Sequence, residues 1–197
     1  MNYTQIIDEA GRYVTQYMNS HTEKKPAYHN LDHTKSVVAN AIQIANHYQL
    51  NDADFFTVVI AAWFHDIGYY TGTAQGHEER GAGMAAEFLQ ARQAGEDIIA
   101  NVRNCIMATK MPVDPVNLVE KILCDADTWH LGTPDFRAMD ALVWQELELR
   151  LNKTFDHKAE RTLHFLEMHT YHTSYCQQLL DEGKRRNKEQ LKSEINP

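Results

Sequence analysis

Apolar residues recur at intervals of three and four along almost the whole chain, and this spacing constrains the fold more than any other feature. Alternating apolar and polar runs are few, and no Asn-Gly or Asp-Gly pair offers a tight hairpin turn. Residues 31–45 illustrate the helical spacing, with one apolar face formed by Leu31, Val37, Val38, Ala41, Ile44 and Ala45. The chain is therefore predicted to be an all-α, single-domain helical bundle.

Caps and breaks divide the sequence into about seven or eight helices. The predicted helices cover 4–18, 31–45 after an Asn30 cap, 52–65, 78 to just before Gly95, 97–108, 116–128, a segment after 134, and 156–180. Asp114-Pro115 and Thr133-Pro134 each give the signal of a cap followed by a proline at the first helical position. Polar loops are expected at 19–29, 67–77 and 109–115. Residues 1–182 would form the domain, and the charged segment 183–197 would form a tail or a solvated helix.

The composition limits the classes of function. The chain has 197 residues, of which 43% are hydrophobic, and this is enough for one domain with a substantial core. Its 27 acidic residues outnumber 19 basic ones, and the formal charge of −8 argues against binding a nucleic-acid polymer. A small phosphorylated ligand stays possible, because a bound metal ion supplies local positive charge.

The expected location of the protein is the cytoplasm. Its three cysteines include no CxxC pair, which predicts free thiols in a reducing compartment. The first residues show neither a basic region nor an apolar region of a signal peptide, and no apolar stretch reaches the ~18 residues of a membrane span.

Metal-competent side chains lie at the ends of three predicted helices. The apolar run "FFTVVIAAWF" ends on His65-Asp66, and His33 lies in the first turn of the helix after Asn30. Asp125 and Asp127 lie near the end of the helix over 116–128. Two imidazoles with carboxylates suit a divalent ion that keeps open coordination positions, such as Mn, Fe, Co, Ni or Mg. They suit a structural zinc ion poorly, because that ion usually recruits thiolates.

The adjacency of His65 and Asp66 indicates where the ion would lie. Neighbouring side chains on a helix point about 100° apart, so one ion contacts both only at the end of the helix. Gly68 is expected to help the chain turn away at that point.

Five blocks in a fixed order resemble the HD superfamily of metal-dependent phosphohydrolases. They are "YHNLDHT", "AAWFHDIGYY", "GHEERGAGMAAEFL", "MATK" and "LCDADTWHLG", and together they span about residues 28–132. The resemblance implies an all-α bundle with one divalent metal ion held by His33, His65, Asp66 and Asp127. Asp125 would support the site from a second layer, although the choice between Asp127 and Asp125 is open. The interval between Asp66 and Asp127 contains no histidine besides His77, which favours one ion over two.

The activity that the resemblance implies is hydrolysis of a phosphate ester or anhydride in a nucleotide or a similar small molecule. Asp66, Glu78 or Glu79 would accept a proton from the attacking water. Lys110 would neutralise a phosphate, and His77 would donate a proton to the leaving group or recruit a second metal ion. The mouth of the site would be lined by Tyr28, His29 and Asn30.

Plainer interpretations exist for most of these residues. Glu78 and Glu79 lie at a helix start, where acidic side chains favour the macrodipole. Asn30 serves equally well as an N-cap, and Lys110 as a solvated loop residue. For the whole protein, the alternative is a nucleotide-binding or sensing module with weak or no catalysis, which would form the amino-terminal part of a longer signalling protein. A structural helical adaptor without metal is a third reading, and the long last helix allows a homodimer.

Overall fold

The structure is a computed structural model that describes residues 1–21 and 26–195. Residues 22–25, which belong to the predicted loop 19–29, and residues 196–197, at the end of the predicted tail, lie outside the described part. Within the described part the chain forms nine α-helices, two short 3-10 helices and no β-strand. The prediction of an all-α fold is therefore confirmed.

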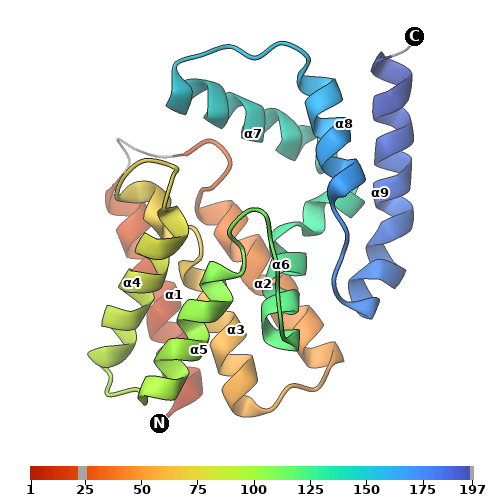
Figure 1. Ribbon diagram of the computed structural model, residues 1–197. Helices are drawn as coiled ribbons and strands as arrows, with labels where there is room; N and C mark the ends of the chain where they lie inside the picture. The colour runs from red at the N-terminus through yellow and green to blue at the C-terminus, as the bar shows by residue number, and fades with distance from the viewer. Residues whose placement is uncertain (22–25, 196–197) are drawn as a thin grey trace.

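Six helices form the main bundle (Figure 1). They are α1 (Tyr3–Ser20), α2 (Leu31–His47), α3 (Asp52–Phe64), α4 (His77–Gln90), α5 (Glu96–Met107) and α6 (Leu118–Asp127). The 3-10 helix η2 (Ile67–Tyr70) follows α3, and η3 (Trp129–Gly132) follows α6. Three further helices complete the chain: α7 (Phe136–Leu151), α8 (Lys158–Met168) and α9 (Ser174–Ile195).

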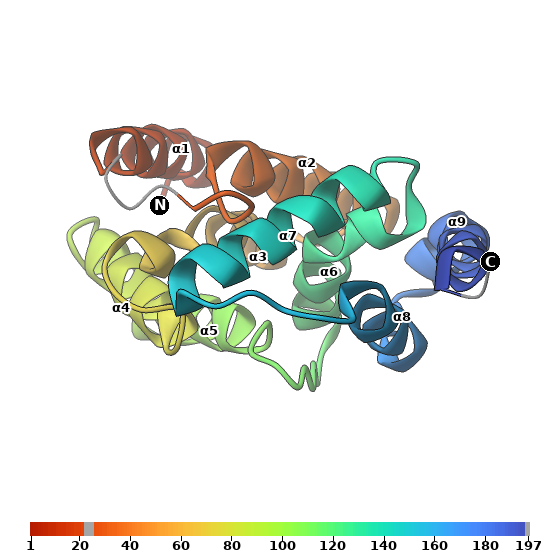
Figure 2. The same ribbon diagram turned by 90° about the horizontal axis from the view of Figure 1, so that it is seen from above.

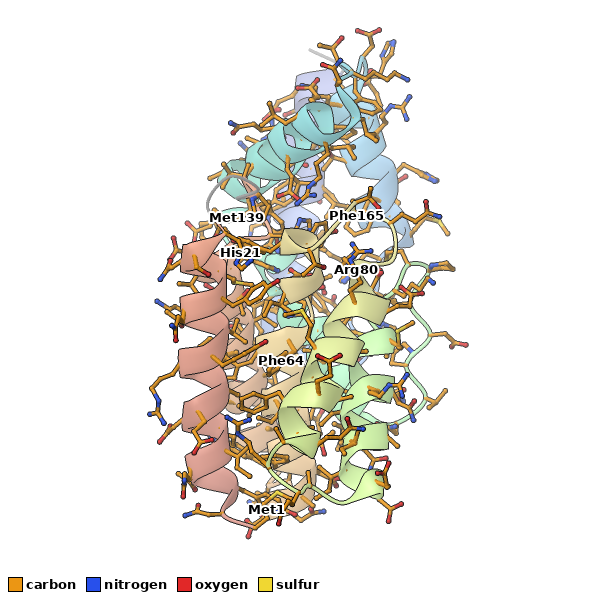
Figure 3. All side chains as sticks on the ribbon, turned by 90° about the vertical axis from the view of Figure 1, so that its left-hand side faces the viewer. Met1, His21, Phe64, Arg80, Met139 and Phe165 are labelled. Carbon is orange, nitrogen blue, oxygen red and sulfur yellow. The ribbon has the colours of Figure 1, made fainter. Side chains whose placement is uncertain are left out.

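Helix α3 forms the centre of the main core. Its residues from Phe56 to Ala62 and its last residue, Phe64, are all buried. Figure 3 labels Phe64 among the side chains between α1 and α4. Its ring lies 5.8 Å from that of Tyr13 of α1 and 5.3 Å from that of Phe88 of α4, measured between centroids. Because α3 is buried on nearly all sides, the polar side chains that follow Phe64 are buried too. Their polar atoms must therefore find hydrogen-bond partners or other ligands inside the protein.

One end of the bundle gathers the parts of the chain that matter for the site. The start of α2, the end of α3, the start of α4 and the end of α6 all lie at the upper end in Figure 1, and α7 runs across this end. The view from above shows α7 over the bundle, with α8 and α9 to one side (Figure 2). A smaller core of Leu131, Phe136, Leu166 and Leu191 joins these last helices.

The prediction of one long helix over 156–180 is wrong. Helix α8 ends at Met168 and α9 begins at Ser174. The buried carboxylate of Asp125 accepts hydrogen bonds from the backbone N–H groups of His172 and Thr173, at 2.7 and 2.8 Å. These bonds hold the backbone between the two helices out of a helical path, and the Thr173 hydroxyl then accepts from the N–H of Cys176 in the first turn of α9.

Several helix boundaries also differ from their sequence signals. Helix α6 begins after an Asn117 cap rather than at Asp114-Pro115, and α7 begins after Asp135 rather than after Thr133. Helix α4 ends at Gln90, and Gly95 is the residue before α5. The predicted loop 67–77 starts with η2, whose residues are buried. Boundaries are set by tertiary contacts that local signals do not contain.

The charged carboxyl-terminal segment is helical as far as the structure describes it. Helix α9 continues to Ile195, and Leu191 within it is fully buried. Gly183 of α9 packs on Gly132 of η3 so closely that a Cβ atom at Gly183 would lie 1.9 Å from the Gly132 carbonyl oxygen. No described helix has the combined length and apolarity that a membrane span requires.

Candidate metal centre

Four side chains converge where the helix ends meet: His33 of α2, His65 and Asp66 after α3, and Asp127 at the end of α6. One nitrogen or oxygen atom from each lies within 4.8 Å of the other three. The Nε2 atom of His33 is 3.2 Å from Asp66 Oδ2 and 3.0 Å from Asp127 Oδ1, and the Nε2 atom of His65 is 3.1 Å from Asp66 Oδ2. The structure thus brings together the four residues that the resemblance singles out.

Local hydrogen bonds fix the two histidines in place. The Asn30 side chain accepts from the N–H groups of Asp32 and His33, so it caps α2 and orients its first turn. The Nδ1 atom of His65 lies 2.8 Å from the carbonyl oxygen of Ala62. A carbonyl only accepts, so this nitrogen carries the proton of the neutral ring and Nε2 presents a lone pair to the cluster.

Three of the facing atoms are buried without a hydrogen bond. They are His33 Nε2, His65 Nε2 and Asp66 Oδ2. Burying an unpaired polar atom costs free energy, and native proteins leave few such atoms. Two imidazole nitrogens and carboxylate oxygens that point at one another are also the donor set that divalent first-row ions prefer. The residues therefore fit a divalent metal ion at their centre.

The electrostatics of the cluster are those of a cation site. Burial by itself lowers the pKa of His33, but the Asp127 and Asp66 carboxylates beside it outweigh this effect, and the pKa lies above its usual value. Burial likewise opposes the charged form of Asp66, yet the neighbouring His65 and other imidazoles hold its pKa well below the usual range. Without a metal ion the carboxylates favour protonated imidazoles, and a cation that binds here displaces those protons.

Asp125 lies apart from the cluster. Its carboxylate is fully buried and accepts three hydrogen bonds, two from the backbone of 172–173 and one from the Thr173 hydroxyl at 2.6 Å. Asp127, two residues later, faces His33 and His65 instead. The two carboxylates of "DAD" therefore have different neighbours: Asp125 anchors the start of α9, and Asp127 faces the His33 and His65 imidazoles.

His77 is the nearest additional imidazole. Its Nε2 atom lies 3.6 Å from Asp66 Oδ1, and its Nδ1 atom donates to the carbonyl of Ala74 at 2.8 Å. Glu78 is buried, and its Oε2 atom lies 3.3 Å from His77 Nδ1. His77 therefore faces Asp66 Oδ1, whereas Asp66 Oδ2 faces His33 and His65.

Gly68, which the sequence assigns to a turn, has a different role. Its φ is not positive, since Gly76 is the only described glycine with that conformation. A Cβ atom at Gly68 would instead lie 2.1 Å from the carbonyl oxygen of His77. The missing side chain lets the start of α4 contact η2 directly, and this contact brings His77 to Asp66.

Glu79 and Lys110 form an ion pair with each other, and both side chains are half-exposed. Arg80 of α4 donates to the carbonyl oxygens of Gly68 and Gln75 and to the Thr71 hydroxyl, so it holds the segment after η2 (Figure 3). In the structure, Lys110 is paired with Glu79, and Arg80 donates to backbone and hydroxyl oxygens of the chain.

Tyr28 and His29 are tied to α7 by a residue that the sequence did not single out. Glu146 accepts from the backbone N–H groups of Tyr28 and His29 at 2.8 and 3.0 Å, and from the His29 Nδ1 atom at 2.8 Å. Burial raises the pKa of Glu146, but these donors outweigh it and lower the pKa to about 2. Tyr28 packs its ring 4.5 Å from that of His33, and its hydroxyl contacts His130.

Tyr69 of η2 forms an aromatic layer beside the metal centre. The His29 ring stacks on Tyr69 at 4.1 Å between centroids, and the His77 ring lies at 3.9 Å. The guanidinium carbon of Arg150 lies 4.6 Å from the centre of the same ring. Local sequence gave a weak signal for this layer, namely the i,i+4 pair of Glu146 and Arg150 on α7.

Comparisons with known proteins agree with this geometry. The family described as "HD domain" matches residues 30–131. The crystal structure of the Lin1889 protein from Listeria innocua superimposes with a TM-score of 0.66, covering 98% of this chain and 95% of that chain at 15% sequence identity. At this identity the similarity shows a shared fold. No curated protein matches the sequence.

Proposed function

The chain belongs to the HD domain family, and on this premise we propose that it is a phosphohydrolase that uses one divalent metal ion. HD domains form a superfamily of metal-dependent phosphohydrolases. The substrate class that we propose is a phosphate ester or anhydride of a nucleotide or of a similar small molecule. The observation that carries the proposal is a set of three buried atoms, on His33, His65 and Asp66, that form no hydrogen bond and face one another and Asp127 at distances of about 3 Å.

The metal ligands in this proposal are His33, His65, Asp66 and Asp127. When bound, a divalent ion there lowers the pKa of a coordinated water and polarises a phosphoryl oxygen. The Ala62 carbonyl keeps His65 in the tautomer that presents Nε2, and the Asn30 cap keeps His33 in register. These two supports hold the imidazoles in their positions before any ion arrives.

Asp66 has two separate tasks in the proposal. Its Oδ2 atom faces the ligand histidines, whereas its Oδ1 atom faces His77 Nε2. A carboxylate in this position accepts a proton from the attacking water, and His77 orients it. Glu78 in turn supports His77, and Glu79 with Lys110 lies at a more exposed position.

His29 is the proton donor that we propose for the leaving group. Its Nδ1–H bond to Glu146 fixes the ring orientation and leaves Nε2 as the free ring nitrogen. The Nε2 atom is then the position from which His29 would transfer a proton to a leaving oxygen. Tyr69 limits the ring to one plane by stacking on it at an interplanar angle of 13°.

The test is activity resolved by metal. Protein stripped with a chelator would receive Mn, Mg, Co, Ni, Fe or Zn singly, and the release of phosphate or pyrophosphate would be followed on a panel of nucleotides. We expect turnover that requires metal and is lost in Asp66→Asn. Asp8→Asn, which removes the same charge from an exposed position on α1, is the matched control and should retain activity.

Two results would contradict the proposal. Stoichiometric metal and nucleotide binding without turnover would favour the sensing module. Wild-type protein that binds none of the six metals would contradict the ligand assignment itself.

A further inference from the structure

Arg150 on α7 is a cation whose bonding capacity is only partly used. A guanidinium carries five N–H donors and no acceptor. The Nε atom of Arg150 donates to Glu146 Oε1 at 2.8 Å, and the side chain is 20% exposed. Its Nη2 atom, however, is buried and has no hydrogen-bond partner among the described residues. Burying a donor of a charged group without a hydrogen bond costs free energy, so an acceptor that reaches Arg150 Nη2 would stabilise this position.

Glu146 cannot supply that acceptor. A carboxylate has about four lone-pair positions. Four N–H groups already occupy them: Oε1 accepts from Arg150 Nε and His29 Nδ1, and Oε2 accepts from the backbone of Tyr28 and His29. The usual two-pronged pairing of guanidinium with carboxylate is therefore absent here, and the buried Nη2 atom of Arg150 is left without an acceptor.

The guanidinium is also held in a defined orientation. Its carbon lies 4.6 Å from the centre of the Tyr69 ring, within the range of a cation–π contact. Glu146 holds it from the side through Nε, so two contacts fix the fork before a ligand arrives. A fixed planar fork with a free prong is the geometry that recognises a phosphoryl or carboxylate group.

The place of Arg150 points to a particular part of a ligand. Arg150 and His77 both contact the Tyr69 ring, at 4.6 and 3.9 Å from its centre, and the His77 Nε2 atom is 3.6 Å from the proposed metal ligand Asp66. An anion held by Arg150 would thus lie next to the same aromatic ring that contacts His77. The neighbouring cations Arg80 and Lys110 are engaged by the protein's own oxygen atoms.

We propose that Arg150 binds a second phosphoryl group of the substrate, so that the site selects molecules with two or more phosphoryl groups over those with one. This inference rests on the proposed function for its site and extends it to the class of substrate. The metal centre would hold the group that reacts, and Arg150 would hold a group further along the same phosphate chain. Arg150 is a specificity-determining residue in this scheme and takes no part in the bond cleavage.

The test uses two phosphonates that the protein cannot hydrolyse. Methylenediphosphonate carries two phosphoryl groups and methylphosphonate carries one. Their dissociation constants would be measured by calorimetry, with Mg²⁺ in equal excess in the cell and the syringe. The variants would be Arg150→Gln, the charge-retaining Arg150→Lys, and Arg186→Gln, a control that removes the same charge from an exposed position on α9.

The expected result is selective. Wild-type protein should bind the diphosphonate more tightly than the monophosphonate. Arg150→Gln should weaken the diphosphonate about 10- to 100-fold, the range of a charge-assisted hydrogen bond, and should change the monophosphonate by less than about twofold. Arg150→Lys should fall in between, because an ammonium keeps the charge and loses the fork. Arg186→Gln should match wild type.

Three outcomes would overturn the inference. They are equal binding of both phosphonates by wild type, an equal loss for both in Arg150→Gln, and no loss for either. Arg150→Lys keeps the test decisive if Arg150→Gln does not fold, since a diphosphonate affinity equal to wild type in the lysine variant contradicts a role for the fork. Failure of the proposed hydrolysis is a separate result, because neither phosphonate is turned over.

Discussion

Replacing Gly68 by alanine tests whether the close contact between η2 and α4 builds the metal centre. The added Cβ atom would lie 2.1 Å from the His77 carbonyl oxygen, whereas ordinary contact begins at 3.4 Å. The two backbones must therefore separate by about 1.3 Å, the difference between these distances. The opposing atoms belong to the backbone, so no side-chain rotation relieves the clash.

The expected cost follows from that displacement. Forcing one extra carbon into a packed contact destabilises proteins by about 1–3 kcal/mol. The shift also carries His77 away from Asp66 Oδ1, which is now 3.6 Å from its Nε2 atom. Loss of a group that orients a metal ligand lowers metal affinity by about 10- to 100-fold. Both effects should therefore appear in Gly68→Ala.

Gly83 is the matched control within α4. A Cβ atom there would meet nothing within 4 Å, so Gly83→Ala should stabilise the helix by about 0.5–1 kcal/mol. The free energy of unfolding would be measured in urea with chelator present, and the affinity for Mn²⁺ by calorimetry. If Gly68→Ala matches wild type in both quantities, the contact does not build the site and the reasoning is refuted.

Three further predictions follow from the buried carboxylates. The pKa of Glu146 in the folded protein, about 2, lies below the usual 4.5, so its carboxylate stabilises the fold above pH 4.5. This contribution is lost as the pH falls to 2, at up to about 1.4 kcal/mol per pH unit. In urea titrations at different pH values, Glu146→Gln should therefore lose less stability than wild type between pH 4.5 and pH 2. A metal ion at a concentration 100-fold above its Kd stabilises the folded protein by about 2.7 kcal/mol. In calorimetric scans, removing the metal with chelator should therefore lower the melting temperature of wild type by about 5–10 °C. The melting temperature of Asp66→Asn should not change. Asp125→Asn should lose about 2–3 kcal/mol in urea while retaining metal by elemental analysis, whereas Asp127→Asn should lose metal with a smaller loss of stability; the reverse pattern would exchange their roles.

The sequence predicts which four side chains meet in the candidate metal centre, because these residues lie at helix ends that local signals mark. Asn30 is a cap in the sequence and in the structure, and it positions His33. The apolar run of α3 ends where His65 and Asp66 begin. These local features place metal-competent side chains at helix ends, and the resemblance to the HD superfamily supplies the choice of Asp127 over Asp125.

The parts that the sequence does not predict depend on contacts between distant residues. The contact between Glu146 and His29 joins positions 117 residues apart, and the i,i+4 spacing of Glu146 and Arg150 in "WQELELR" does not indicate that His29 is the partner. The break between α8 and α9 contains neither glycine nor proline, because Asp125 of α6 imposes it from outside. Local periodicity carries no information about either contact.

The link between Glu146 and the segment before α2 has a consequence for the order in which the site is assembled. All four proposed metal ligands precede residue 128, so a chain leaving the ribosome carries the complete set before Glu146 and Arg150 have been synthesised. Closing the contact from 29 to 146 is a late step, because it must wait for α7 and bring together ends far apart in the chain. We therefore expect a nascent chain to bind metal before it can discriminate between phosphorylated ligands.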